Sequence, residues 1–511
     1  MSNSDSSTPA APKGAGRFLR FSLIYAFGDL LTKGARIVLI PYYLSVMTKA
    51  EIGELAVLQA IIFCVWTILA FGLGFAVRRY YYDYENQSPT LGDTFVSTLW
   101  LGRLIVGLPI YAMLLGAGYL FCEFSGGSLA LNLILVAISA GFLKGGLNVV
   151  EFWLNIREEP IKYRAFTFSQ FLTTTLIIIY FVSVMKLGVM GVILGELVSY
   201  SFFALVSAFL LFRKARPKFA VIDWRELFSY CAPVLPHALF MWGMMGIDRL
   251  ILNEYVDKPE IGVYEIGYLL GSFLSIVVRS MRAAWIPSYF KNANDEDSKL
   301  QFGKIASIYF YFAFYTALAG MLFAPEIIWL FSLTATSSYL ESVHVMRIVL
   351  FGFVAMAVFL AINQPLLYER RTGILALISF SGLVINVLVN LWLIPTMGIW
   401  GAAAATVAAY VFMAFITFVV TRKIYQFEWE TGSNLVVCSA FIAFAVAACY
   451  LPPEPVLWIL PVKVGVLVAF PLVPLFRVHR SESKAIKIEP RFGWTQIASL
   501  RRKRQAPNGS Q

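Results

Sequence analysis

The chain has 511 residues, of which 59% are hydrophobic and only 14% are charged. An ordinary soluble protein has roughly 45–50% apolar and about 25% charged residues, and a water-soluble core of this size cannot bury so much apolar surface. The same apolar content excludes a disordered chain. The sequence is therefore that of a membrane protein with many spans, and most of its formal net charge of +11 has to lie outside the bilayer.

Apolar runs along the chain predict about fourteen membrane-spanning helices, because each crossing needs roughly 20 mostly apolar residues. In chain order, the predicted spans are 18–45, 52–77, 94–120, 128–152, 162–185, 187–212, 226–253, 261–288, 303–331, 343–367, 373–395, 398–421, 434–451 and 456–476. The sequence therefore predicts an all-α polytopic membrane protein.

The basic residues of the loops predict the orientation of these spans, because Lys and Arg concentrate in cytoplasmic loops. With the N-terminus in the cytoplasm, the cytoplasmic loops and both tails hold most of the 41 Lys and Arg residues. The opposite side holds only Lys49, Lys186 and Lys258. We therefore expect both termini to lie in the cytoplasm.

Two sequence motifs return later in the chain at nearly the same spacing. Lys49-Ala-Glu-Ile-Gly53 returns 209 residues later as Lys258-Pro-Glu-Ile-Gly262, and Gly188-Val-Met-Gly191 returns 210 residues later as Gly398-Ile-Trp-Gly401. Predicted helices 1–6 and 7–12 are therefore interpreted as two copies of one six-helix unit. Because each unit has an even number of helices, a two-fold axis along the membrane normal should relate the copies.

These features divide the chain into six parts. Two tails enclose two lobes of six helices, a basic linker connects the lobes, and two additional helices follow the second lobe. The predicted boundaries are 1–16 for the polar cytoplasmic N-terminal tail, 17–214 for the N-lobe, 215–225 for the basic cytoplasmic linker, 226–424 for the C-lobe, 425–476 for helices 13 and 14, and 477–511 for the basic cytoplasmic C-terminal tail.

Basic residues near the middle of the membrane outnumber the acidic residues of the same helices. Charge at this depth is costly and usually faces a partner or a water-filled cavity. An excess of cations favours an anionic substrate such as a phosphate or pyrophosphate. We therefore predict six substrate-binding residues: Lys33, Arg36, Arg103, Lys144, Arg279 and Arg282.

Acidic residues at the same depth are candidates for coupling transport to a proton or another cation. These residues are Asp29, Glu196 and Asp248. For Asp29 there is an alternative, because Lys33 lies one helical turn away and the two can form a local neutral pair.

Three other charged residues lie within reach of the membrane surface: Glu151, Arg249 and Lys463. We expect these side chains to snorkel, so that the charged end reaches water while the apolar stem stays in the membrane.

Motifs for common catalytic and cofactor sites are absent from the sequence. It contains no P-loop, no zinc-protease motif and no nucleophile elbow, and its five cysteines are scattered. We therefore expect no metal and no cofactor. Asp295-Glu-Asp297 has the D-x-D spacing of metal-dependent glycosyltransferases, but its short polar loop is more typical of a solvated turn.

Three segments carry a family resemblance. They are Ile40-Pro41-Tyr-Tyr-Leu-Ser45 followed by Glu51-Ile-Gly53, Gly246-Ile-Asp248-Arg249-Leu-Ile-Leu252 followed by Ile261-Gly-Val-Tyr264, and Arg282-Ala-Ala-Trp-Ile-Pro287-Ser-Tyr-Phe290. In this order they resemble the polysaccharide transporter (Wzx-type) flippases, of the MOP superfamily that includes the MATE exporters and the lipid II flippases. The resemblance covers roughly residues 18–476. It implies a MATE-like fold with two six-helix lobes around a cavity, in the bacterial cytoplasmic (inner) membrane.

The resemblance and the membrane-depth cations together predict a transporter rather than an enzyme. The expected substrate is a polyprenyl-diphosphate-linked oligosaccharide, which alternating access moves outward for O-antigen, capsule or exopolysaccharide biosynthesis. Expected partners are a coupling proton or sodium ion, the glycan polymerase machinery, and anionic lipids at the C-terminal tail around Arg501-Arg-Lys-Arg504. Nucleic acid is not expected, because the net charge lies mainly in this tail and the loops.

Two alternatives stay open. A multidrug exporter of the same fold should have fewer basic residues in its cavity, because many drugs are cationic. A membrane glycosyltransferase or polymerase should depend on Asp295 and Asp297, and we would expect it to have a larger external segment than these short outer loops provide.

Overall fold

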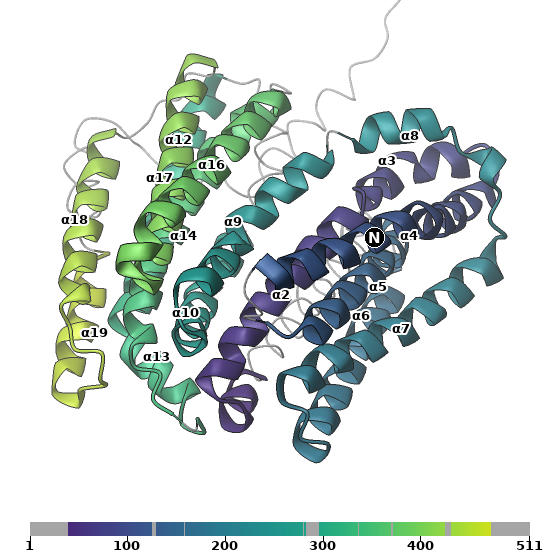
Figure 1. The fold of residues 1–511 in the computed structure, drawn as a ribbon. Helices are drawn as coiled ribbons and strands as arrows, with labels where there is room; N and C mark the ends of the chain where they lie inside the picture. Colours follow the sequence, from purple (N-terminus) through teal and green to yellow (C-terminus); the bar gives the residue numbers. More distant parts are fainter. Residues whose placement is uncertain are drawn as a thin grey trace, which may run out of the picture.

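The computed structural model describes residues 39–124, 129–157, 159–232, 234–279, 281–282, 296–335, 337–368, 371–424 and 431–471. The elements within these ranges are all helices, and they form two main bundles (Figure 1). The prediction of an all-α membrane protein with many spans is confirmed.

The N-lobe is built around α5, which packs against α2, α4 and α7, while α6 packs against α7. α2 begins with a capping box, in which Thr48 and Glu51 satisfy each other's backbone N–H groups. This cap fixes the first turn of α2 at the boundary between the lobes. The N-lobe elements are α2 (Lys49–Leu69), α3 (Leu73–Glu85), α4 (Leu91–Phe124), α5 (Leu131–Ile156), α6 (Pro160–Ile179), η1 (Tyr180–Val184) and α7 (Gly188–Lys214).

The C-lobe has the same kind of core, in which α14 packs against α10, α12 and α17, and α16 packs against α9 and α17. α18 and α19 lie against α12, at the outer edge of the molecule in Figure 1. The elements are η2 (Phe219–Val221) and α8 (Trp224–Cys231) in the linker, then α9 (Val234–Tyr255), α10 (Lys258–Gly271), α12 (Glu296–Leu322), α13 (Ala324–Phe331), α14 (Ser342–Ile362), α15 (Gln364–Tyr368), α16 (Thr372–Met397), α17 (Ile399–Ile424), α18 (Thr431–Cys449), η3 (Leu457–Ile459) and α19 (Leu460–Ala469).

Ten helices of the described residues are long and apolar enough to cross a membrane, and α12 with α13, bent by 62°, forms an eleventh candidate. Most of the first predicted span, 18–45, lies outside the described residues. The predicted span 226–253 combines α8 and α9, which are separate helices. α19 has only 10 residues, fewer than the predicted span 456–476. The count of fourteen therefore stays a prediction.

The repeated motifs occupy equivalent places in the two lobes. Gly188 and Gly398 both have a positive φ, +54° and +55°, which glycine adopts without steric cost. A Cβ atom on Gly188 would lie 2.7 Å from the carboxylate of Glu51, and one on Gly398 would lie 3.5 Å from that of Glu260. In each lobe, therefore, the glutamate of the first motif lies beside the first glycine of the second motif. This equivalence supports the interpretation of two copies.

The two copies of the first motif also meet each other, where α2 and α10 pack side by side (Figure 1). A Cβ atom on Gly53 would overlap the backbone oxygen of Lys258, and one on Gly262 would overlap that of Lys49. Only glycine fits at these two positions, because backbone atoms cannot move aside as a flexible side chain can. We call Lys49–Glu54 together with Lys258–Gly262 the inter-lobe junction.

Side chains at the same end hold the lobes together. Lys258 Nζ lies 2.8 Å from Glu54 Oε1, and Lys49 Nζ lies 5.5 Å from the centre of the Tyr339 ring. Thr334 Oγ1 donates a hydrogen bond of 2.9 Å to the backbone oxygen of Pro41. These polar contacts are partly exposed and individually weak, so the junction depends mainly on the packing of α2 against α10.

We predict that Gly53→Ala hinders closure of the inter-lobe junction, because the added methyl group collides with backbone of the other lobe. Closure is measured as the rate at which a short thiol-specific reagent cross-links cysteines at positions 54 and 258, in a chain whose native cysteines are serine. The rate should fall severalfold.

The matched control is Gly116→Ala in α4, where an added Cβ atom meets nothing within 4 Å. This variant should cross-link like the parent. If the two glycine variants cross-link at equal rates, the close approach of the lobes is wrong.

Candidate functional site

A polar cluster lies inside the N-lobe, on α2, α5 and α7. Gln59 Nε2 donates a hydrogen bond of 3.1 Å to Glu196 Oε1. Lys144 Nζ lies 4.9 Å from the centre of the Trp66 ring and 5.5 Å from that of Tyr200, as in a cation–π contact. We call these five residues the N-lobe polar cluster. Two of the predicted site residues, Lys144 and Glu196, therefore lie in one group.

Glu196 is the least satisfied member of this cluster. Its Oε2 atom is buried and has no hydrogen-bond partner among the described residues. A buried acceptor without a donor is costly while the carboxylate is charged. This oxygen can therefore accept a further hydrogen bond or contact a cation.

Glu151 extends the polar region along α5. When the Asn148 amide is oriented to satisfy both neighbours, its nitrogen donates to Glu151 Oε2 at 3.3 Å and its oxygen accepts from the indole N–H of Trp66. Glu151 therefore adjoins the N-lobe polar cluster. This contact was not predicted, because it depends on how α2 and α5 face each other.

The C-lobe contains an ion-pair network between α9 and α10. Arg249 lies 2.8 Å from Asp248 and 2.9 Å from Glu265, and it stacks over the Tyr268 ring at 4.0 Å. Tyr264 donates its hydroxyl hydrogen bond to Asp248. The prediction that Arg249 snorkels is wrong: the residue is only 5% exposed, because two carboxylates satisfy its charge inside the lobe.

Lys463 is likewise buried rather than snorkelling, with 3% of its surface exposed. Its Nζ atom lies 2.6 Å from Glu326 Oε1, and this pair ties α19 to α13. Arg347, which is fully buried, donates to the backbone oxygens of Met321 and Leu451 at 3.2 and 2.8 Å. Both contacts fix the C-terminal helices to the C-lobe.

Arg103, predicted to bind substrate, is surrounded by its own lobe. Its guanidinium donates to the backbone oxygens of Leu69, at 3.0 Å, and of Phe142, and it packs against Gly145 and Gly146. It ties α4 to α2 and α5. The structure therefore gives Arg103 a packing role between these helices.

Arg279 and Arg282 lie at the far end of the span that α10 begins. Arg279 is exposed, and Arg282 is partly buried. Neither has a carboxylate within ion-pair distance among the residues that the model describes. Asp29, Lys33 and Arg36, and Asp295 with Asp297, lie outside those residues.

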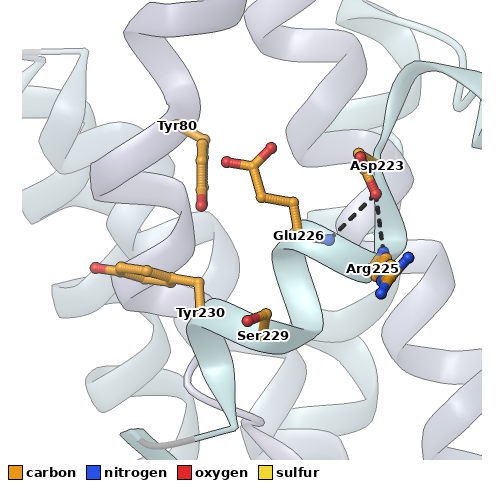
Figure 2. Close-up of a pocket in the computed structure, with 6 residues that line it drawn as sticks. All are labelled: Tyr80, Asp223, Arg225, Glu226, Ser229 and Tyr230. Carbon is orange, nitrogen blue, oxygen red and sulfur yellow. Dashed lines mark hydrogen bonds between the residues drawn. The ribbon is translucent and has the colours of Figure 1, made fainter.

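A surface pocket of about 510 Å³ lies where α3 meets the linker (Figure 2). Asp223 Oδ1 accepts from the backbone N–H groups of Arg225 and Glu226 and so caps α8. The rings of Tyr80 and Tyr230 meet edge to face at 5.5 Å. With Ser229 these residues line the pocket, where two carboxylates outnumber one guanidinium, so it is poorly suited to an anion.

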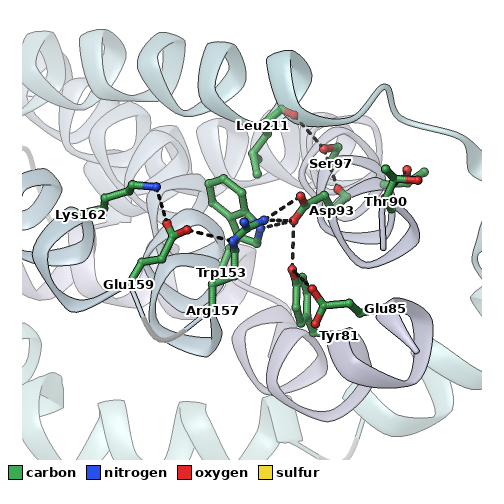
Figure 3. Close-up of polar contacts among 11 residues, drawn as sticks. Tyr81, Glu85, Thr90, Asp93, Ser97, Trp153, Arg157, Glu159, Lys162 and Leu211 are labelled. Carbon is green, nitrogen blue, oxygen red and sulfur yellow. Dashed lines mark hydrogen bonds and ion pairs between the residues drawn. The ribbon is translucent and has the colours of Figure 1, made fainter. Parts of the chain in front are cut away.

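A second network, missed by sequence reasoning, joins α3, α4 and α5 (Figure 3). Asp93 accepts from Arg157 at 2.7 Å, from the Trp153 indole at 2.8 Å and from the Tyr81 hydroxyl at 3.1 Å. Burial lowers the pKa of Arg157, but the bonds and charge of Asp93 outweigh this effect, so the pKa of Arg157 lies above its ordinary value. Arg157 therefore stays charged and holds the three helices together.

The paired bundles, the narrow junction between them and the polar groups inside each lobe define a membrane protein with the MATE-like fold. A solved structure titled lipid II flippase MurJ, inward closed conformation, superposes with a TM-score of 0.67 at 15% identity, over 91% of this chain and 99% of that one. An inward-facing multidrug resistance MATE transporter of the MOP superfamily gives a TM-score of 0.64 at 16% identity, over 79% and 97%.

The chain belongs to the polysaccharide biosynthesis protein family, whose model matches residues 18–293. The MatE family model matches residues 233–392. An uncharacterized membrane protein of Haemophilus influenzae is 25% identical over 291 residues, which cover 55% of this chain and 68% of that protein. The predicted family resemblance is thus confirmed.

We predict that Asp93→Ala lowers the free energy of unfolding by roughly 2–3 kcal/mol, because it leaves a partly buried guanidinium and two other donors without their acceptor. The fall is measured by thermal unfolding in detergent micelles. The control is Asp83→Ala, which removes only an exposed pair with Arg79 and should change stability by under about 0.5 kcal/mol. Equal losses in the two variants would show that the Asp93 network stabilises the fold no more than an exposed ion pair does.

Proposed function

We propose that this protein is a flippase that moves a polyprenyl-diphosphate-linked oligosaccharide across the bacterial cytoplasmic membrane, for O-antigen, capsule or exopolysaccharide biosynthesis. Membership of the polysaccharide biosynthesis family supports the substrate class. The observation that carries the mechanism is the inter-lobe junction, where two copies of one motif close the molecule at one end.

The mechanism we propose is alternating access. Lys49 and Lys258 of the junction belong to the loops predicted to face outward, so the closed end is the outer end and both chain termini are cytoplasmic. Substrate would enter from the cytoplasmic side, between the lobes. Separation of Gly53 from Gly262, with loss of the Glu54–Lys258 ion pair, would then open the outer side.

Substrate recognition is assigned to the predicted cations other than Arg103, whose guanidinium donates to backbone oxygens of the N-lobe. Arg279 is exposed and Lys144 is partly buried against aromatic rings. A guanidinium binds pyrophosphate oxygens in a bidentate manner. We propose that Arg279, Arg282 and Lys144 bind the diphosphate and glycan, together with the predicted residues Lys33 and Arg36.

Coupling to a proton or sodium ion is assigned to Glu196. Its unpaired buried oxygen supports this role, whereas Asp248 already accepts from Arg249 and Tyr264. Asp29 remains a predicted coupling residue on the sequence alone. Further proposed partners are the glycan polymerase machinery and anionic membrane lipids.

We predict that Lys144→Glu and Arg279→Glu each reduce translocation of the lipid-linked glycan at least about tenfold, since one reversed charge repels the diphosphate by more than the roughly 1.4 kcal/mol that a factor of ten requires. Cells should accumulate lipid-linked units on the cytoplasmic side. The measurement compares these units with surface glycan at equal protein levels.

The control for this test is Lys423→Glu, an exposed residue at the end of α17, which should transport normally. Normal surface glycan in both site variants would refute the assigned binding residues. The MatE match favours one other candidate function, export of cationic drugs. That function predicts changed drug sensitivity in a deletion strain together with unchanged surface glycan.

We predict that Glu196→Gln separates transport from its driving ion, because an amide keeps the hydrogen-bonding shape but does not titrate. In proteoliposomes, imposed proton or sodium gradients should accelerate transport by the parent and leave the rate of the variant unchanged. Gln59→Leu, which removes only the neutral partner of Glu196, should remain responsive. A gradient response in Glu196→Gln would assign coupling elsewhere.

A further inference from the structure

The segment 213–231, which connects the lobes, begins where a membrane span ends. The span formed by α7 ends at Lys214, and α9 begins after the segment, at Val234. α4, beside this segment, has 34 residues and is therefore about 51 Å long, whereas the apolar layer of a bilayer is about 30 Å thick. The start of α4 and the segment packed on it therefore reach the membrane surface.

This segment is fixed to the N-lobe. Thr98 Oγ1 of α4 accepts from the backbone N–H of Lys218 at 2.8 Å. The Trp224 ring fills the space left by Gly102 on the same helix. Leu227 and Cys231 form the buried face of α8. The segment is therefore an ordered part of the lobe surface, at the top in Figure 1.

The outer side of the segment combines positive charge with aromatic surface. Phe219 and Phe228 are 42% and 46% exposed. Neither is near the middle of a span, where exposure would mean contact with lipid tails. Five basic residues are also exposed, and none forms an ion pair within the part of the chain that the structure describes: Arg213, Lys214, Arg216, Lys218 and Arg225.

We propose that segment 213–231 is a docking surface for anionic phospholipid headgroups. Interfacial helices bind membranes by inserting aromatic side chains while Lys and Arg contact headgroup phosphates. The diphosphate of the proposed substrate has the same phosphate chemistry. The phospholipid is favoured because the five cations are spread along the surface, whereas the pocket within the segment is lined by Asp223 and Glu226 beside Arg225 and so offers a diphosphate no cluster of cations.

The docking would hold the N-lobe at a fixed depth in the membrane while the C-lobe moves.

The test uses the full chain in lipid nanodiscs, with Phe228→Cys carrying a fluorescent label and the native cysteines replaced by serine. The label should be severalfold less accessible to acrylamide, a neutral quencher that membrane charge does not repel, in an equal mixture of phosphatidylcholine and phosphatidylglycerol than in phosphatidylcholine alone. High salt should remove this difference, because it screens surface charge.

Two matched variants test the role of charge. Arg216→Gln with Lys218→Gln should lose most of the protection, whereas Arg422→Gln with Lys423→Gln, which removes two exposed charges at the end of α17, should keep it. Equal acrylamide quenching of the parent in both lipids, or equal loss in the two variants, would overturn the proposal. Protection by inorganic pyrophosphate in phosphatidylcholine alone would overturn the assignment to phospholipid. No glycan substrate is present, so the result is independent of the proposed function.

Discussion

The contact on which the arrangement of the lobes depends is backbone against backbone, between Gly53 of α2 and Gly262 of α10. Helices that approach this closely gain dispersion energy over their whole interface and leave no room for intermediate positions. Past this contact, α2 packs against α9 as well as α10. The Trp242 indole of α9 donates a hydrogen bond of 3.1 Å to the Ala60 backbone oxygen. Farther along α2, Trp66 is one of the residues of the N-lobe polar cluster. One rigid helix thus links the closed end of the molecule to the groups assigned to substrate and ion.

The charges at membrane depth fall into two physical classes. Arg103 and Arg249 are satisfied by partners within one lobe, the first by backbone oxygens and the second by carboxylates. Such a cation stabilises the lobe and is unavailable to a ligand, since extracting it would leave the partners unpaired in a medium of low dielectric. Arg279, by contrast, is exposed, and one oxygen of Glu196 has no donor among the described residues. At Arg279 and Glu196, therefore, binding of a ligand or an ion would lower the free energy of the protein.

The sequence was informative about features that depend on local pattern. Apolar length predicts helices, and the recurrence of Lys-x-Glu-Ile-Gly predicts two copies, which the structure places in contact with each other. The sequence does not predict which way a charged side chain within the membrane points. Hydropathy gives the depth of Arg103, but its partners are backbone oxygens 34 and 39 residues away, and backbone leaves no signal in a sequence. Asp93 was overlooked for a related reason, because its role arises from three helices that meet only in the fold.

The break between α8 and α9 has a mechanical consequence. The apolar run 226–253 suggests one continuous span, yet α8 ends at Cys231 and α9 begins at Val234, beside Pro233 in the sequence, and proline cannot continue the hydrogen-bonding ladder of a helix. α8 is fixed to the N-lobe through Trp224, while α9 belongs to the C-lobe core. The chain therefore crosses from one lobe to the other between Cys231 and Val234. In the alternating access that we propose, the lobes would move against each other between this short connection and the junction.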